Sequence, residues 1–225
     1  MQTTTSLYNR FVRLVIITVF RIMQVVVLTN DSLQEELLSN GIVRDAEIIW
    51  VRSIEELKNY STADAYIDLM HTSAHLASLE ALLPKTVVIN SVEHTLSESN
   101  TAFIRVNGWP TFLKAPIIEA AGQSKEKTDE LFAVFNKKIE WLPDRPGFVT
   151  PRVISMIINE AYMALEEGIS TKEEIDTAMK LGTNYPYGPF EWADKIGLEN
   201  INSLLQKLST TQPRYTPAPL LQASI

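Results

Sequence analysis

Short apolar runs alternate with helical stretches over residues 24 to 113, and this alternation constrains the fold more than any other feature. The runs cover residues 25–28, 47–51, 65–70 and 86–89. Helical patterns fill the spaces between them, up to about Ser39, over 54–60 and over 74–83. Strands that are apolar throughout are typical of parallel strands covered on both faces by helices. This half of the chain therefore predicts a doubly wound α/β sheet.

A different pattern begins after Pro146-Gly147, where the chain reads as helices with defined ends. Thr150 is a good N-cap residue, and Pro151 suits the first helical position. Apolar residues between 153 and 165 cover too wide an arc for a surface helix, which predicts a buried central helix.

Further start and stop signals divide the rest of this half. Gly168 is expected to end the central helix, and Ser170 with Glu173 predicts a capping box for a second helix that Gly182 closes. The remaining predictions are a rigid turn over 184–189, short helices from Phe190 and Glu199, and an extended arm over 213–219.

Composition and charge exclude several classes of function. The chain has no cysteine, so it has no thiolate metal site, cysteine nucleophile or disulfide, and a cytoplasmic location is the simplest expectation. Its net charge is −7, with only 20 lysines and arginines. Neutralising phosphates needs a basic face, so we expect no nucleic-acid partner.

The first 22 residues form a segment with its own composition. Residues 1–30 contain no acid, and arginines at 13 and 21 limit the longest apolar run to 14–20, which is too short for a membrane span. Arg21 stands where a secretory cleavage site needs small residues. We interpret 1–22 as an extension or an organellar presequence, with the start at Met1 or Met23 left open, and we expect no membrane span.

Several motifs after residue 145 identify a family resemblance. Pro146-Gly147-Phe148-Val149 before an arginine-bearing helix, then 170–182, then 185–191 closely resemble the C-terminal helical domain of 3-hydroxyacyl-CoA dehydrogenases, and the tail 215–221 is similar to that family's closing segment. The resemblance implies a Rossmann-like α/β N-terminal domain that binds NAD, followed by an all-α domain that dimerises, with acyl-CoA between them. It divides the chain into an extension (1–22), a reduced Rossmann-like domain (23–145) and the helical domain (146–225), and it predicts a homodimer through the helical half.

The cofactor positions depart from that pattern. A dinucleotide loop needs glycines after the first strand, whereas this turn carries Thr29, Asn30 and Asp31, and the first glycine of the chain is Gly41. Asp31 places a negative charge where a diphosphate belongs, and we expect Asp31 or Ser32 to cap the following helix instead.

Arg52 follows the second strand, where the family has an acid for the ribose hydroxyls. An arginine there either accepts the 2′-phosphate of NADPH or is a surface arginine, and the missing glycines favour the second interpretation. We expect no bound cofactor, and NAD or NADP if the protein is active.

The catalytic positions that the resemblance implies are also altered. The family's general-base histidine falls on Asn107, while Glu119 keeps the position of the glutamate that orients it. An amide does not titrate near neutral pH, so this change removes about 10²–10⁴ in rate. Pro151 replaces a family asparagine, and the substrate-contacting serine aligns with Val92 unless a one-residue shift restores Ser91.

Other chemistry-bearing residues are few. His71 and His75 are spaced to present two imidazoles to a metal, with Asp68 or Glu80 as the third ligand, but two solvated helix residues and no metal are the favoured interpretation. His94 lies in a polar loop, and an acid–base enzyme on this fold would have to recruit one of the three histidines. Trp109 and Trp141 are interpreted as core, or as walls of a pocket at the junction of the halves.

Two hypotheses of different classes follow. The chain is either a non-catalytic or strongly impaired relative that binds an acyl-CoA or a protein partner, or an NAD(P)-dependent 3-hydroxyacyl-CoA dehydrogenase with a recruited base. Three separate requirements are missing together, namely the glycines, the histidine and the asparagine, and this favours the first. The segment between the second strand and Ala65 is also shorter than in the family and removes a helical hairpin that there helps to hold CoA.

Overall fold

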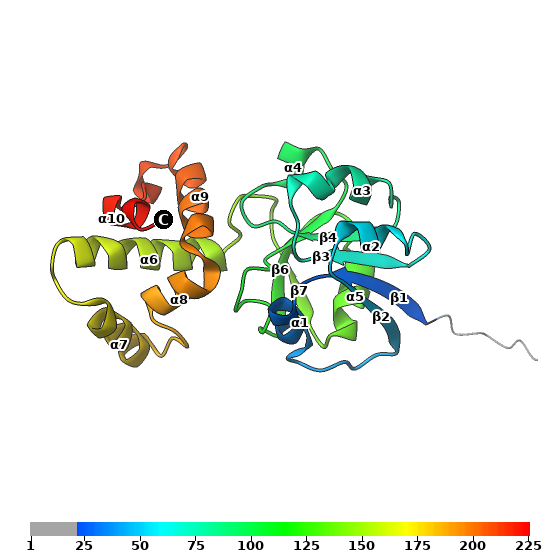
Figure 1. Ribbon diagram of the computed structural model, residues 1–225, viewed down its shortest axis with the longest axis horizontal. Helices are drawn as coiled ribbons and strands as arrows, with labels where there is room; N and C mark the ends of the chain where they lie inside the picture. The colour runs from blue at the N-terminus through cyan, green and yellow to red at the C-terminus, as the bar shows by residue number, and fades with distance from the viewer. Residues whose placement is uncertain (1–21) are drawn as a thin grey trace, which may run out of the picture.

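A seven-stranded sheet followed by a group of helices makes up the computed structural model, which describes residues 22–225 (Figure 1). The predicted extension over 1–22 lies outside the described residues except for Ile22. The strands are β1 (Met23–Leu28), β2 (Ala46–Val51), β3 (Ala65–Asp68), β4 (Thr86–Asn90), β5 (Ile104–Val106), β6 (Ile117–Ala121) and β7 (Lys138–Trp141). The helices are α1 (Asp31–Leu38), α2 (Ile54–Lys58), α3 (Leu76–Glu80), α4 (Leu96–Ser99), α5 (Lys125–Val134), α6 (Thr150–Glu166), α7 (Lys172–Thr183), α8 (Pro189–Ile196), α9 (Leu198–Ser209) and α10 (Pro219–Ala223).

The strand order is β2-β1-β3-β4-β5-β6-β7, and all neighbours are parallel except β5 and β6. The predicted α/β class and parallel core are confirmed. The antiparallel pair was not predicted. It arises because residues 107–116 connect β5 to β6 without a crossover helix, and a parallel connection needs one.

Helices cover both faces of the sheet, as the apolar strands predicted. Val25 and Val27 of β1 pack with side chains of α1 and α5 on one face. Val26 and Leu28, which point to the other face, pack with side chains of α2 and α3. Each residue of β1 from 25 to 28 is therefore buried, which explains the continuous apolar run.

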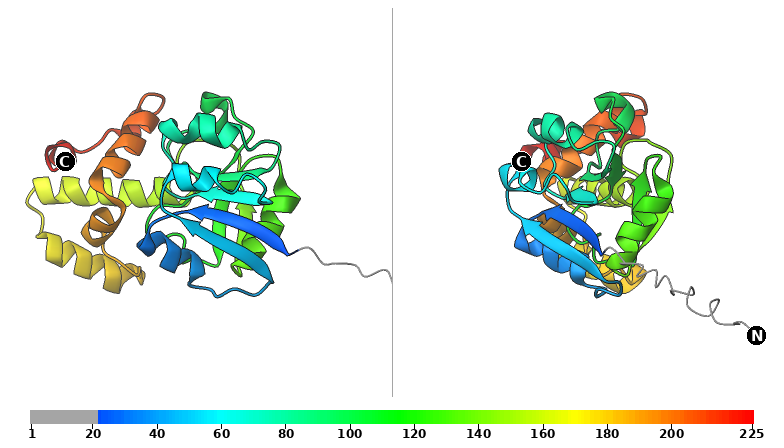
Figure 2. Two further views of the ribbon diagram at one scale, coloured as in Figure 1. Left: turned by 45° about the vertical axis from the view of Figure 1, so that its right-hand side comes forward. Right: turned by 90° about the vertical axis from the view of Figure 1, so that its right-hand side faces the viewer.

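The helical part lies to one side of the sheet in Figure 1 and in the left view of Figure 2. Its core forms around α6, as predicted, with buried residues from α8, α9 and the tail. Val92, Trp109 and Ala121 of the α/β part belong to the same apolar cluster. The two parts therefore share packed side chains.

Three helix ends differ from the predictions by a residue or two. Thr150 is the first residue of α6, and Val149 precedes it as the N-cap. The capping box of α7 pairs Thr171 with Glu174 rather than Ser170 with Glu173. The Thr171 hydroxyl accepts a hydrogen bond from the Glu174 amide, and the Glu174 carboxylate accepts one from the Thr171 amide. Helix α7 continues through Gly182 and ends at Asn184, which adopts the left-handed conformation.

The C-terminal tail is held against α6. Asn159 of α6 is buried, and its side chain accepts a hydrogen bond from the Ala218 amide (2.7 Å) and donates one to the Thr216 carbonyl (3.0 Å). The predicted extended arm contains a turn of 3-10 helix (Pro213–Tyr215) and leads into α10. Over residues 22–225, no helix has both the length and the apolar character that crossing a membrane requires.

Candidate functional site

A cavity of about 520 Å³ opens at the carboxyl ends of the parallel strands. Ligands of open α/β sheets bind at this edge, because loops from successive strands meet there. Asn90 at the end of β4 accepts a hydrogen bond from the Gly108 amide, and a β-carbon at Gly108 would stand 2.7 Å from the Asn90 carboxamide carbon. Residues of the α/β part line most of the cavity, and Asn200 of α9 closes it from the helical side.

Asn107, which directly follows β5, contacts Glu119 of β6, and neither residue is among those that line the cavity. The Asn107 side-chain amide donates to Glu119 Oε2 at 3.2 Å, and the backbone amide of Asn107 donates to the Glu119 carbonyl. Asn107 is buried. The structure therefore brings together the two positions that the family resemblance paired.

Glu119 also starts the central helix. Its Oε1 accepts hydrogen bonds from the amides of Val149 (3.2 Å) and Thr150 (2.9 Å) and from the Thr150 hydroxyl (2.9 Å). These amides have no partner within α6, and the positive end of the helix dipole favours a carboxylate there. Glu119 thus serves as the N-terminal cap that Thr150 was predicted to provide.

The turn after β4 is organised by an arginine that the sequence reasoning missed. Arg105 of β5 is fully buried, pairs with Asp144 at 2.6 Å and donates to the carbonyls of Ser91, Val92 and Arg145. Burial lowers its pKa, and the hydrogen bond and charge of Asp144 oppose that effect. A charged residue in the middle of an otherwise apolar strand was the signal that pointed to it.

Ser91 lines the cavity, as does Val92, so the structure places both candidates for the serine position there. The Ser91 hydroxyl donates to the His94 carbonyl at 2.9 Å and so stabilises the turn itself. His94 lines the same cavity, but its side chain is 71% exposed, as expected of a loop histidine.

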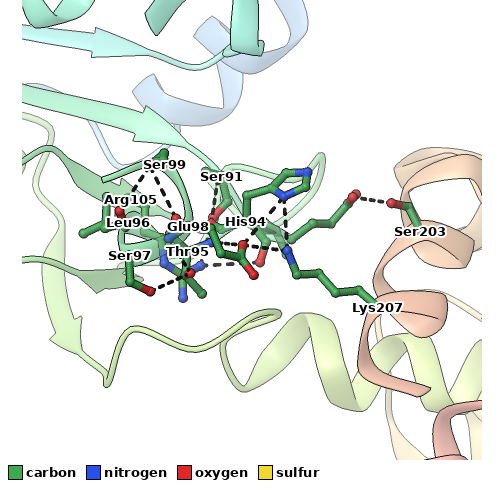
Figure 3. Close-up of polar contacts among 12 residues, drawn as sticks. Ser91, His94, Thr95, Leu96, Ser97, Glu98, Ser99, Arg105, Ser203 and Lys207 are labelled. Carbon is green, nitrogen blue, oxygen red and sulfur yellow. Dashed lines mark hydrogen bonds and ion pairs between the residues drawn. The ribbon is translucent and has the colours of Figure 1, made fainter. Parts of the chain in front are cut away.

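Side chains of α9 reach across to this turn (Figure 3). Lys207 donates to Glu98 Oε2 at 2.6 Å and lies 3.1 Å from His94 Nδ1, and Ser203 donates to Glu93. Partial burial acts to raise the pKa of Glu98, but hydrogen bonds from Lys207 and Thr95 outweigh it and hold that pKa below its ordinary value. This network ties the helical part to the rim of the cavity.

The turn after β1 is held by hydrogen bonds made by the chain's own side chains. Asn30, and neither Asp31 nor Ser32, caps α1, because its Oδ1 accepts the Leu33 amide at 2.9 Å. Thr29 is fully buried. The prediction for the cap was therefore wrong by one residue.

Arg52 crosses the same turn. Its guanidinium donates to the Thr29 carbonyl (2.9 Å), to Asp31 (2.5 Å) and to Gln34 Oε1 (2.8 Å). Arg52 is 46% exposed, as a surface arginine would be, but its hydrogen bonds are made to the turn.

These residues do not fit the NAD that the family resemblance implies. A diphosphate needs free amides at the start of α1 and close approach of the backbone, which glycine allows. Here the Asn30 side chain takes one of those amides, and the Asp31 carboxylate carries the charge that a diphosphate would meet. Arg52 pairs with Asp31, so a 2′-phosphate would have to compete with that carboxylate.

The two tryptophans separate. Trp109 is buried in the apolar cluster shared by the two parts, and it also lines the cavity. It is therefore both a core residue and a wall of the pocket, the two interpretations that the sequence allowed. Trp141 packs on the edge strand β7, where its indole donates to Asp129 at 3.0 Å.

The histidines at 71 and 75 are not the two solvated residues that were favoured. Their side chains are 10% and 16% exposed, and both face the buried carboxylate of Asp68. Glu80, the other suggested partner, is not part of this cluster.

The sheet, the cavity at its carboxyl edge and the helical part beside it define an α/β protein with an all-helical C-terminal part. The family model for the C-terminal domain of 3-hydroxyacyl-CoA dehydrogenase matches residues 147–225. The chain is 31% identical over 186 residues to a 3-hydroxybutyryl-CoA dehydrogenase of Clostridioides difficile, which is 80% of this chain and 65% of that protein. Residues 147–225 therefore belong to the 3-hydroxyacyl-CoA dehydrogenase family, and the chain as a whole is similar to its members.

Other relatives match shorter or more distant stretches. A 3-hydroxyadipyl-CoA dehydrogenase of Escherichia coli (strain K12) is 43% identical over 88 residues, 38% of this chain and 18% of that protein. The chain thus spans less than two thirds of the length of both curated relatives named here. The crystal structure of (S)-3-hydroxybutyryl-CoA dehydrogenase from Ralstonia eutropha shares the fold, with a TM-score of 0.68, 21% identity and coverage of 90% of this chain and 93% of that one.

Proposed function

We propose that this chain is a non-catalytic member of its family, which binds an acyl-CoA in the central cavity and does not oxidise or reduce it. The observation that carries the proposal is the turn after β1, where Asn30 takes the Leu33 amide and Arg52 donates to the Thr29 carbonyl and to the Asp31 carboxylate. No hydride can be transferred unless a nicotinamide cofactor is seated.

Two further features support the loss of turnover. Asn107 stands where the family has its general base, and an amide cannot take the hydroxyl proton of a 3-hydroxyacyl substrate. Its partner Glu119 has a second role, because its other oxygen accepts three hydrogen bonds from the start of α6.

The cavity supports the binding half of the proposal. Its volume of about 520 Å³ falls within the range of small-molecule sites, and it lies between the sheet and α9, where the family places acyl-CoA. We propose further that the chain acts in the cytoplasm as a homodimer through its helical part.

Calorimetric titration with NADH, NADPH and acetoacetyl-CoA in turn tests the function. We expect no heat from either cofactor at millimolar concentration and saturable heat from acetoacetyl-CoA. Ser91→Phe, which places a ring in the cavity, should abolish the acyl-CoA signal, while Ser61→Phe, at an exposed serine outside the cavity lining, should leave it unchanged.

Each arm has an outcome that contradicts it. Micromolar binding of NADH or NADPH would show that the turn seats a diphosphate in another way, and it would favour the active dehydrogenase with a recruited base. Failure of acetoacetyl-CoA to bind would remove the acyl-CoA ligand from the proposal.

A further inference from the structure

A buried carboxylate with two imidazoles lies at the carboxyl end of β3. Asp68 is the last residue of that strand and is fully buried. His71 follows in the next turn, and His75 ends a short 3-10 helix (Ser73–His75) that leads into α3. The chain has three histidines, and two of them meet at this carboxylate.

The three side chains converge on one point. His71 Nδ1 lies 3.2 Å and His75 Nδ1 2.7 Å from the same oxygen, Asp68 Oδ2. One ligand atom from each residue can be chosen so that all lie within 4.8 Å of one another. Two ligands of a tetrahedral zinc ion, each bonded at about 2.0–2.2 Å, lie roughly 3.4 Å apart, so small side-chain rotations would open this cluster to the required spacing.

The Asp68 carboxylate is held in a fixed orientation and has no lysine or arginine partner among residues 22–225. Its other oxygen accepts the Met70 amide at 3.1 Å, which fixes the carboxylate plane as outer-shell hydrogen bonds do in metal sites. Among residues 22–225, no lysine or arginine forms an ion pair with Asp68. A buried carboxylate requires compensation, and here only imidazoles and one amide supply it.

We propose that Asp68, His71 and His75 form a binding site for a divalent transition-metal ion, with Zn²⁺ as its representative. Two imidazoles and one carboxylate are a donor set that Zn²⁺ and related ions accept, and three protein ligands leave a coordination position for water or another oxygen donor. Because His71 also lines the central cavity, the ion lies at the cavity edge. The proposal is independent of the acyl-CoA function.

Titration of chelator-treated protein with zinc chloride tests the site. The wild type should bind one ion per chain. His71→Gln and His75→Gln each remove a ligand while keeping a side chain that donates to Asp68, and each should weaken zinc binding by about a hundredfold or more, since even outer-shell changes cost 10–100-fold. The matched control is His94→Gln, the third histidine, which should bind zinc as the wild type does.

Two readouts keep the test independent of any single variant. Co²⁺ added to wild-type protein should produce the visible absorption of a four-coordinate site, and this absorption should be absent from the double variant His71→Gln/His75→Gln. Zinc should raise the thermal midpoint of the wild type and of His94→Gln, but not that of the double variant, whose fold is checked by circular dichroism. Absence of stoichiometric binding to the wild type, or equal loss in all three single variants, would overturn the proposal and leave a hydrogen-bonded Asp–His cluster.

Discussion

Glu119 shows how one side chain can serve two contacts. The Asn107 amide donates to its carboxylate at 3.2 Å. The carboxylate, however, also holds the first amides of α6. The pair thus joins the end of β5, β6 and the helical part. This structural role gives a reason for a glutamate at position 119 that does not depend on catalysis.

Restoring the base alone should therefore not restore chemistry. We expect Asn107→His to show no NADH-dependent reduction of acetoacetyl-CoA, because the Asp31 carboxylate and its ion pair with Arg52 remain at the cofactor turn. A spectrophotometric assay of NADH consumption measures this. Turnover above the wild-type background would refute the account of the turn.

Lys137 gives a prediction on pH. It is 3% exposed and donates to Asn40 and to the carbonyls of Leu113 and Ala115. Burial lowers its pKa to about 8, and the charge of Glu36 opposes that effect. The unfolded chain keeps the ordinary value of 10.5.

Between pH 8 and 10.5 the unfolded chain thus binds more protons than the folded one, so this residue makes the free energy of unfolding rise with pH across that window. Below pH 8 both states are protonated and the penalty of burial is present in full. The gain is about 3 kcal/mol at most. Urea denaturation at several pH values should show this rise in the wild type and in Lys138→Met, an exposed neighbour, but not in Lys137→Met.

Among the elements, the junction of α7 and α8 explains a glycine in the family motif. Asp176 of α7 caps α8 by accepting the amides of Phe190 (2.8 Å) and Glu191 (3.2 Å). A β-carbon at Gly188 would stand 2.3 Å from the Asp176 carboxyl carbon. The φ of Gly188 is −74°, which any residue can adopt, so backbone conformation does not require glycine here. Glycine is needed because a side chain would collide with Asp176.

Gly188→Ala should therefore destabilise the protein by about 2 kcal/mol, since Asp176 cannot move without leaving α8 uncapped. The matched control is Gly182→Ala. Gly182 lies within α7, and an added β-carbon there would meet no atom within 4 Å, so alanine should be neutral or stabilise by up to about 1 kcal/mol. Thermal denaturation of both variants measures the difference, and equal midpoints would contradict the role given to Asp176.

For the molecule as a whole, several contacts join its two parts. Glu119 starts α6, Lys207 and Ser203 of α9 hold the cavity rim, and Trp109 packs into the helical core. On the helical part, Val149 and Val153 are 55% and 49% exposed and lie one turn apart at the start of α6. An exposed apolar pair on that helix suits the proposed dimer.

Val153→Glu should therefore shift the protein from dimer to monomer, because a charge would be buried between the two copies. Light scattering after size-exclusion chromatography measures the mass. Ile42→Glu, at an equally exposed apolar residue of the α/β part, should leave the dimer intact. A wild-type monomer, or a Val153→Glu dimer, would exclude this face of α6 as the interface.

The fold class and the order of most elements were available from local patterns. Continuous apolar runs such as 25–28 predicted covered parallel strands, and the wide apolar arc of 153–165 predicted the central helix. Both signals depend on neighbours within a few positions along the chain, so they survive in a bare sequence. The family motifs of the helical half are equally local.

Contacts between distant residues required the tertiary structure. Asn107 and Glu119 could be paired only through the family resemblance, and the link from Glu119 to α6 spans about thirty positions with no local trace. The same holds for Arg105 and Asp144, and for the antiparallel pairing of β5 with β6. Such contacts depend on the order of the strands in the sheet. The spacing of apolar residues along the chain does not determine that order.

The histidine cluster shows both sides of this division. The spacing of His71 and His75 was visible in the sequence, and Asp68 was named as one of two candidate partners. Their burial was not visible, because it depends on how the end of β3 turns into the helix that follows. Spacing along the chain identified the chemical groups, and only folding in three dimensions brought them around one oxygen atom.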